Sequence, residues 1–152
     1  MAKPDATKEE MEAVLQKVNL LGFLQTQNGL QTELLEKAGN LSGGQCQRLV
    51  IARALLRSDS AVYIFDEAAS NIDVESEELI MNVIHELAKT KTVLLISHRL
   101  ANVVQSDQIY FLKNGTICER GTHAELMEQN GAYCHLYDSQ MVLENYGKEG
   151  NA

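Results

Sequence analysis

The first third of this 152-residue chain carries apolar residues at helical spacing. Thr7 and Glu10 form a T-x-x-E capping box, which is the signal for a helix start. Apolar residues then recur every three or four positions, at Met11, Val14, Leu15, Val18 and Leu21. We therefore expect an amphipathic helix that begins after Thr7 and ends near Gly22. Residues 25–40 are polar and contain glycine, which predicts a connecting loop.

Two further helix starts can be read in the middle of the chain. Ser42 and Gln45 form a second capping box, S-x-x-Q, and Asp73 is a suitable N-cap residue. Each is followed by apolar positions at helical spacing, namely Leu49, Val50, Ala52, Leu55 and Leu56 after the first, and Leu79, Ile80, Val83, Ile84 and Leu87 after the second. Both segments should be helices with one buried face.

Two short apolar runs, residues 61–65 and Thr92–Ile96, have no polar face at all. Runs of this kind are typical of parallel strands buried on both faces. The helix expected after Asp73 lies between them in the sequence, so we predict a right-handed crossover and parallel pairing.

The last third predicts a hairpin followed by helices. Asn114-Gly115 separates apolar residues 109–112 from residues 116–118, and this dipeptide is the strongest short hairpin signal. Thr122 and Glu125 predict one more capped helix, and a final helix should cover about 131–145. The residues from Gly147 onward should be frayed.

The composition of the chain limits the kinds of partner that it could bind. The net charge of -8 argues against a nucleic-acid or anionic-membrane surface, because both call for clustered Lys and Arg. No apolar run approaches the ~20 residues that cross a bilayer. The odd number of cysteines suggests a reducing compartment. Their spacing with the nearby histidines fits no common zinc pattern (Cys46, Cys118, Cys134, His123 and His135).

The segment Leu41-Ser42-Gly43-Gly44-Gln45 is a candidate anion site. Unpaired N–H groups at a helix start, made accessible by glycines, attract phosphate, and the Ser42 hydroxyl adds a donor. The alternative is an ordinary capped helix with a Gly-Gly entry turn. Gly-Gly-Gln also occurs in peptide-release factors, but in a basic, RNA-facing context that this acidic chain lacks.

Two acids and a histidine follow the predicted strands. Asp66 and Glu67 come at the end of the first strand, where Asp66 could orient Mg²⁺ and Glu67 could act as general base toward water. His98 follows the second strand about thirty residues later and could hydrogen-bond a phosphate. The alternatives are two solvated acids and a structural histidine. His85, within a helix, is expected at the surface.

In this order, these segments resemble the signature, Walker B and H-loop motifs of the nucleotide-binding domain of ATP-binding-cassette (ABC) transporters. Ser70-Asn71-Ile72-Asp73 resembles the D-loop, usually S-A-L-D, and Gly121 to Leu126, G-T-H-x-E-L, resembles exporter-type cassettes in particular. Cys46 stands where the family usually has Arg or Lys, which removes one positive charge. The resemblance covers nearly the whole chain.

The resemblance implies a fold and a division of roles. The fold is α/β, a partial P-loop NTPase (RecA-like) core with a helical signature subdomain, parallel strands and a C-terminal β-hairpin. Residues 1–58 would be the helical subdomain and residues 59–146 the partial core, within 1–152 as the C-terminal portion of the domain. Glu67 and His98 would be catalytic and Asp66 would hold Mg²⁺. ATP would contact the signature residues Ser42, Gly43, Gly44 and Gln45, with Asp73 linking two sites.

The resemblance also implies partners: a second nucleotide-binding domain in a head-to-tail dimer and a transmembrane domain, at the cytoplasmic face of the membrane. No G-x-x-x-x-G-K-[ST] (Walker A) occurs in the 152 residues. We therefore expect the segment to belong to a longer ATPase that exports a solute and to be inactive by itself. We also expect it to leave one sheet edge and one apolar patch uncovered. The alternatives are a catalytically inactive binding module and a soluble ABC ATPase acting on nucleic acid or ribosomes.

Overall fold

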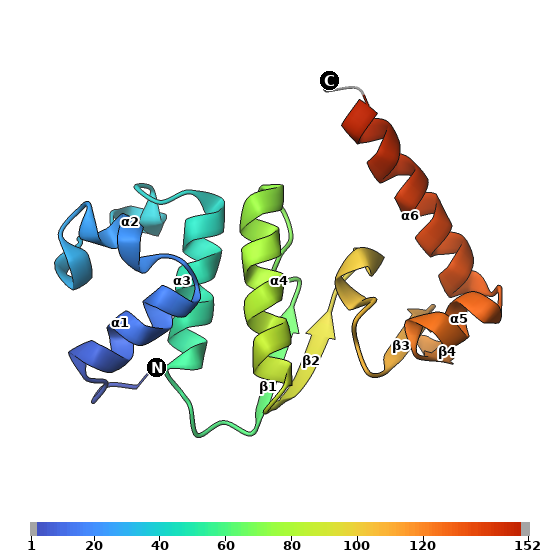
Figure 1. Cartoon of the computed structure of the whole chain (residues 1–152), viewed down its shortest axis with the longest axis horizontal. Helices are drawn as coiled ribbons and strands as arrows, with labels where there is room; N and C mark the ends of the chain where they lie inside the picture. The colour runs from blue at the N-terminus through green and yellow to red at the C-terminus, as the bar shows by residue number, and fades with distance from the viewer. Residues whose placement is uncertain (1–2, 150–152) are drawn as a thin grey trace. The chain divides into compact units, whose positions relative to one another are not determined.

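The computed structural model describes residues 3–149 and forms two compact units, one ending at Ile96 and the other beginning at Ser97. The first contains helices and a parallel strand pair, and the second contains a β-hairpin and helices (Figure 1). The predicted α/β class is confirmed. The predicted division near residue 58 stays a prediction, and the compact unit that contains this residue continues to Ile96.

The helical part of the first unit contains α1 (Lys8–Lys17), α2 (Leu21–Gln25), two 3-10 turns (Gly29–Gln31 and Glu36–Ala38) and α3 (Gly43–Leu55). The capping boxes at Thr7 and Ser42 are both present, so the two predicted helix starts are confirmed. Most of the segment expected as a loop is irregular, with the two 3-10 turns inside it.

The first helix ends earlier than predicted, at Lys17 rather than near Gly22. Asn19 adopts a left-handed backbone, with φ 51°, and its N–H donates to Gln16 O, while Leu20 N–H donates to Leu15 O. This pair of bonds is a Schellman motif, in which asparagine takes the position usually held by glycine. The chain then turns into the short helix α2.

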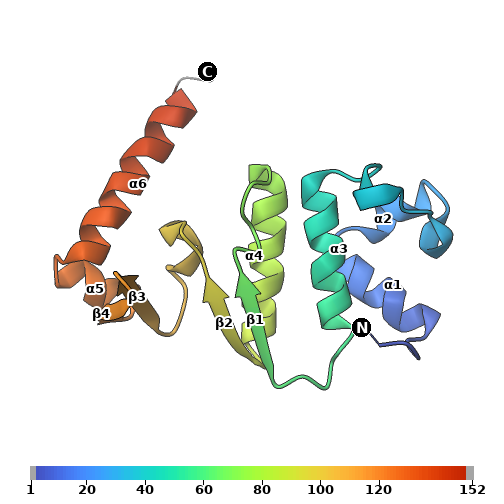
Figure 2. The ribbon, with the colours of Figure 1, turned by 180° about the vertical axis from the view of Figure 1, so that it is seen from behind.

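A parallel strand pair follows: β1 (Val62–Asp66), α4 (Val74–Ala88) and β2 (Thr92–Ile96). The register pairs Val62 with Thr92 and Asp66 with Ile96, which confirms the predicted parallel pairing. Helix α4 lies over one face of the strands, and α3 packs between α4 and α1 (Figures 1 and 2). Tyr63 and Phe65 are buried in the same hydrophobic core as Ile80 and Ile84 of α4.

The other face of the strand pair is open, so the expectation of burial on both faces is wrong for this chain. Val62 is 55% exposed, Ile64 65%, Leu94 49% and Ile96 45%. Tyr63 and Phe65 belong to the buried core with α4, whereas the alternate side chains of the two strands are exposed to solvent. The expected uncovered apolar patch is confirmed.

The second unit contains a 3-10 turn (Leu100–Val103), β3 (Ile109–Lys113), β4 (Thr116–Gly121), α5 (His123–Glu128) and α6 (Ala132–Glu149). Asn114 and Gly115 have φ values of 52° and 78°, as a two-residue hairpin turn requires, so the predicted hairpin is confirmed. The Thr122 capping box also forms. Leu126 and Tyr133 are fully buried at the centre of this unit.

The last helix, α6, is longer than predicted because it passes through Gly147 to Glu149. A single glycine costs a helix only about 1 kcal/mol, which does not terminate it. The expected fraying is therefore wrong at residues 147–149, and residues 150–152 lie outside the described residues. No helix in the described part of the chain combines the length and apolar character needed to cross a bilayer.

Candidate functional site

The signature segment forms a capped helix start. Ser42 Oγ accepts a hydrogen bond from the Gln45 N–H (3.2 Å), and Gln45 Oε1 accepts one from the Ser42 N–H (2.9 Å). Because the Ser42 oxygen acts as acceptor here, its own proton remains available for donation. The N–H groups of Gly43 and Gly44 are in the first turn, where an α-helix offers them no partner. Ser42, Gly43 and Gly44 can therefore supply three donors to an anion.

The two glycines have different surroundings. A Cβ at Gly43 would meet only Ile72 Cγ2, at 3.9 Å, which is an ordinary contact. A Cβ at Gly44 would overlap Ser76 Oγ and lie 2.6 Å from Ser76 Cβ. Gly44 is therefore the point at which the start of α3 packs against the start of α4, whereas Gly43 has room beside it.

Arg48 holds the start of α3 from one turn further on. Its Nε donates to Gly44 O (3.3 Å) and its Nη1 donates to Asn19 O (3.0 Å). The Cys46 thiol, at the position where the family usually has Arg or Lys, donates to Ala38 O at 3.9 Å. The Arg48 guanidinium is therefore committed to backbone carbonyls of the same unit.

Asp73 is the N-cap of α4, as predicted. Its Oδ1 accepts from the Ser76 N–H (2.8 Å), and its Oδ2 would lie 3.2 Å from a Cβ at Gly44. The hydrogen bonds from Ser76, and to a smaller degree the charge of Arg48, hold the pKa of the Asp73 carboxyl below its ordinary value. Asp73 is therefore ionised and lies where the starts of α3 and α4 meet.

The carboxylate pair comes at the carboxyl end of β1. Asp66 is the last strand residue and is exposed, and Glu67 follows it with a left-handed backbone, φ 52°. The Glu67 N–H donates to Ile96 O (3.0 Å), and the Ser70 N–H donates to Glu67 O (3.0 Å). These bonds hold Glu67 in a conformation that costs a non-glycine residue roughly 1–3 kcal/mol and that clusters at active sites.

The carboxylate oxygens at this end of β1 are ligands of the kind that Mg²⁺ prefers. Magnesium is usually held by one or two carboxylates together with water and substrate phosphates, rather than by an all-protein cage. Asp66 offers one exposed carboxylate. Among residues 3–149, the structure shows no cluster of three or more His, Cys, Asp or Glu side chains that would make such a cage.

His98 belongs to the second unit and is exposed. Its carbonyl accepts a hydrogen bond from Gln140 Nε2 (2.7 Å), and the Leu100 N–H donates to Gln140 Oε1 (2.9 Å). The structure thus ties the His98 loop to α6. Glu67 belongs to the first unit and His98 to the second, so a common catalytic role for the two residues stays a prediction.

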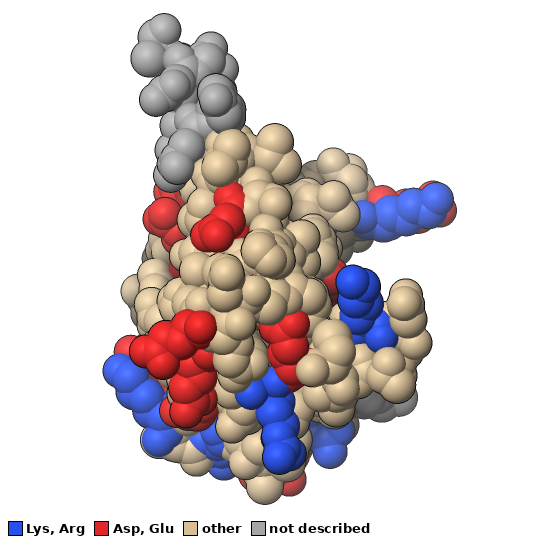
Figure 3. All heavy atoms as spheres, turned by 90° about the vertical axis from the view of Figure 1, so that its right-hand side faces the viewer, with Lys and Arg blue, Asp and Glu red and all other residues tan. Residues whose placement is uncertain are grey.

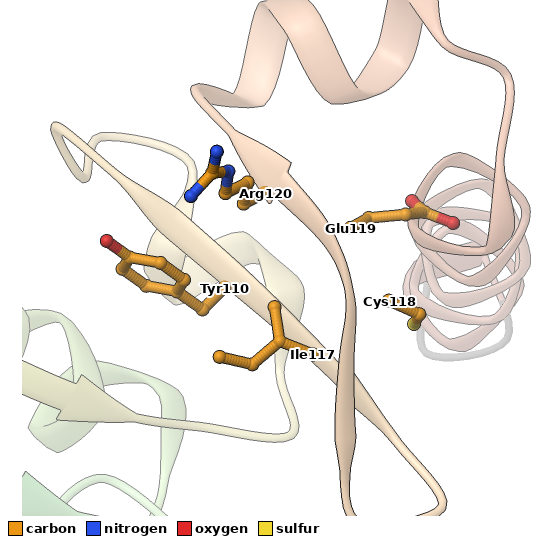
Figure 4. A pocket seen from close by; sticks show the side chains of 5 residues that line it. All are labelled: Tyr110, Ile117, Cys118, Glu119 and Arg120. Atoms are coloured by element: carbon orange, nitrogen blue, oxygen red, sulfur yellow. The ribbon is translucent and has the colours of Figure 1, made fainter.

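A pocket on the hairpin lies apart from these motifs. It is lined by residues of β3 and β4, and Figure 4 shows Tyr110, Ile117 and Arg120 on one side of the ribbon with Glu119 pointing the other way. Glu119 is engaged elsewhere, because its carboxylate accepts from the N–H groups of Ala132 (2.6 Å) and Tyr133 (3.0 Å) at the start of α6. The pocket therefore contains no residue of the predicted site.

Neither the surface charge of the described residues nor the cysteines point to a further functional site. On the face drawn in Figure 3, acidic and basic side chains are interspersed with uncharged surface. Burial and the neighbouring Asp138 carboxylate raise the pKa of the Cys134 thiol, which keeps it protonated. The Cys118 thiol donates to Phe111 O (3.4 Å).

Sequence reasoning missed three residues that shape these segments: Ser76, Gln140 and Glu119. A small residue three positions after an N-cap could have pointed to Ser76, since such a position can allow close helix packing. Nothing in the local sequence around Gln140 or Glu119 signals a contact, because their partners lie 42 and 13 residues away.

Comparisons with known proteins identify related chains. A family model described as ABC transporter matches residues 2–70. An uncharacterized ABC transporter ATP-binding protein of Haemophilus influenzae is 51% identical over all 152 residues, which are 27% of that protein. An ATP-dependent lipid A-core flippase of Mannheimia succiniciproducens is 46% identical over 140 residues, 91% of this chain and 24% of the flippase. The chain therefore spans about a quarter of the length of these relatives.

A solved structure of a bacterial Atm1-family ABC exporter with ATP bound has a similar fold, with a TM-score of 0.81 and 31% sequence identity over 91% of this chain and 24% of that one. The match to the family model, the relatives that align along the whole chain and the exporter structure together show that this chain belongs to the ABC transporter ATP-binding family and corresponds to the C-terminal portion of an exporter-type ATP-binding domain.

Proposed function

We propose that this chain is part of an ATPase that drives export of a solute across a membrane. The observation that carries the proposal is the capped start of α3, where Ser42, Gly43 and Gly44 offer three donors to a phosphate. The relatives support it, because they are named as ABC transporter ATP-binding proteins and as flippases. The transported solute would be selected by membrane segments of the longer protein.

The phosphate that Ser42, Gly43, Gly44 and Gln45 meet would belong to ATP held by a second ATP-binding domain in a head-to-tail dimer. This arrangement would place two composite sites at the dimer interface. Asp73 would link them, since its carboxylate lies beside the start of α3 and caps α4. The dimer would work with a transmembrane domain at the cytoplasmic face of the membrane.

Glu67 would act as the general base. Hydrolysis requires a water molecule to lose a proton as its oxygen attacks the γ-phosphorus, and a carboxylate within hydrogen-bond reach can accept that proton. The fixed backbone of Glu67, tied to Ile96 and Ser70, would hold the carboxylate in one place. His98 would donate to the γ-phosphate and orient it.

Asp66 would bind Mg²⁺, directly or through water, with oxygen ligands from ATP completing the shell. When bound, the metal supplies positive charge that neutralises the phosphate oxygens. The exposed position of Asp66 at the end of β1 supports this assignment.

A second candidate is a binding module without activity of its own. The 152-residue sequence contains no G-x-x-x-x-G-K-[ST], so this polypeptide has no phosphate loop to hold the β- and γ-phosphates. We expect the polypeptide alone to bind ATP with a Kd above ~1 mM, which corresponds to only about -4 kcal/mol of binding free energy. Micromolar binding by calorimetry would contradict this expectation.

The assignment of Glu67 is tested by joining this segment to the phosphate-loop half of the Haemophilus influenzae relative, which is 51% identical to it. Glu67→Gln should lower turnover by ~10²-fold or more and preserve ATP binding, because the amide keeps the shape but accepts no proton. Glu78→Gln is the matched control, since Glu78 is an exposed acid on α4. Wild-type turnover in the Glu67→Gln protein would refute the catalytic assignment.

A further inference from the structure

The backbone on either side of Arg99 is held by one side chain of the last helix. Gln140 of α6 donates from Nε2 to His98 O (2.7 Å) and accepts at Oε1 from the Leu100 N–H (2.9 Å). The side-chain amide therefore pairs with the main chain much as a neighbouring strand would. The contact joins residues more than forty positions apart in the sequence.

The chemistry of the amide fixes its orientation. A carbonyl oxygen only accepts and an N–H only donates, so His98 O needs the NH₂ group and the Leu100 N–H needs the carbonyl. Only glutamine or asparagine presents both groups on one planar unit. Leucine offers neither of them, and glutamate offers an acceptor but no donor.

Two further contacts hold the same loop. Arg99 forms an ion pair with Glu144 (Nη2 to Oε1, 3.0 Å), one helical turn beyond Gln140. Ser97 Oγ accepts from the Arg99 N–H (3.0 Å) and donates to Arg99 O (3.1 Å), which closes a local turn. Both neighbours of His98 are therefore constrained, and Leu100 is buried.

We propose that Gln140 is a positioning residue for His98, through which helix α6 sets the main-chain path that carries the imidazole. The proposal rests on the function proposed for His98, contact with the γ-phosphate. A donor must lie within hydrogen-bond distance of its acceptor, and a misplacement of about 1 Å can cost up to ~10²-fold in rate. The amide of Gln140 bonds directly to the carbonyl of His98, the residue that carries the imidazole. It therefore fixes the main-chain position from which the imidazole extends.

The first test uses the 152-residue chain without nucleotide. Gln140→Leu removes both hydrogen bonds at similar volume, whereas Gln140→Glu keeps an acceptor for the Leu100 N–H and removes the donor to His98 O. Ser139→Ala is the matched control on the same helix, because the Ser139 hydroxyl is exposed and donates to His135 O within α6. The readouts are amide hydrogen exchange at Leu100 and the NMR signals of the His98 imidazole.

We expect Gln140→Leu to speed hydrogen exchange of the Leu100 amide by about 5- to 10-fold, because the variant removes the hydrogen bond that protects this amide. Gln140→Glu should leave that amide protected. Both variants should shift the His98 imidazole signals, while those of His85 in the first unit stay unchanged. The amide of buried Tyr133 reports whether the second unit remains folded, and Gln140→Glu decides the test if Gln140→Leu unfolds. Unchanged His98 signals in folded variants, or equal shifts in Ser139→Ala, would overturn the proposal.

The second test measures turnover in the joined protein described above. Gln140→Leu should lower kcat about 10-fold and leave the KM for ATP within about 2-fold, because the donor is misplaced but the other phosphate contacts remain. If Glu67→Gln keeps wild-type turnover in the joined protein, the proposed function fails, whatever the NMR result. If Glu67→Gln is inactive and Gln140→Leu turns over normally, the positioning role of Gln140 is refuted.

Discussion

Gly44 in α3 lies directly against Ser76 in α4, and a Cβ at position 44 would overlap Ser76 Oγ and lie 2.6 Å from Ser76 Cβ. The absence of a side chain at Gly44 therefore lets the two helix starts meet, beside the capping carboxylate of Asp73. The second glycine of the signature segment thus has a packing role that is separate from any contact with phosphate.

This contact predicts a specific rescue. Gly44→Ala should lower the free energy of unfolding by about 1–3 kcal/mol, the usual cost of overpacking. Ser76→Gly removes the atoms that the new methyl group would strike, so the double variant should be more stable than the sum of the two single changes. Urea unfolding of the four proteins gives the coupling energy.

Gly43→Ala is the control for this cycle, because a Cβ there meets only Ile72 at 3.9 Å. It should change stability far less than Gly44→Ala. Strictly additive effects of Gly44→Ala and Ser76→Gly would show that the two positions do not clash.

The left-handed backbone of Glu67 predicts a conflict between stability and activity. Glycine adopts φ 52° without the cost that a side chain brings, so Glu67→Gly should leave stability unchanged or raise it by up to about 1 kcal/mol. The matched control is Ala68→Gly at the next, buried position, which should lose about 1 kcal/mol or more. Thermal unfolding of both variants makes the comparison.

The joined protein should lose turnover with Glu67→Gly, because the base is gone. A clear loss of stability in Glu67→Gly, equal to that in Ala68→Gly, would mean that the backbone at residue 67 is not strained.

Asp73 predicts an acid-dependent loss of stability. Its pKa in the folded state lies below the ordinary value of 3.8, because Ser76 donates to the carboxylate. A depressed pKa stabilises the fold above the unfolded-state value, and this contribution disappears as pH falls from about 5 through the folded-state pKa. Asp73→Ser keeps an N-cap oxygen without a titrating group, so its stability should fall less over this range.

Unfolding free energies measured between about pH 6 and pH 3 test this effect. Asp73→Ala is the control for the cap itself, since it removes the N-cap oxygen and should lower stability at neutral pH as well. Parallel pH curves for wild type and Asp73→Ser would contradict the prediction.

The open face of the β1–β2 strand pair predicts self-association. Val62, Ile64, Leu94 and Ile96 form a contiguous apolar surface on parallel strands, which are normally covered on both faces. Ile64→Lys should shift the chain toward monomer in light scattering at high concentration. Leu112→Lys, an exposed aliphatic on the hairpin, is the control. A wild-type chain that stays monomeric would contradict the prediction.

Local signals in the sequence determined the points at which elements begin and turn. The capping boxes at Thr7, Ser42 and Thr122 and the turn at Asn114-Gly115 formed as predicted, because their hydrogen bonds and dihedral angles involve residues at most three positions apart. The ordered motifs likewise identified the family. The early end of α1 had a local signal in Asn19, but the apolar spacing through Leu21 masked it.

Only the tertiary structure decided which residues meet across the chain. Packing of α4 on one face of β1 and β2 explains why Ile64 is exposed although its run of residues is uniformly apolar. The close approach of Gly44 to Ser76 and the pairing of Gln140 with the His98 loop depend on how helices pack, which no nearby residue encodes. Capping and turn energies are local and can be read along the chain, whereas packing contacts are set by the whole arrangement of elements within each unit.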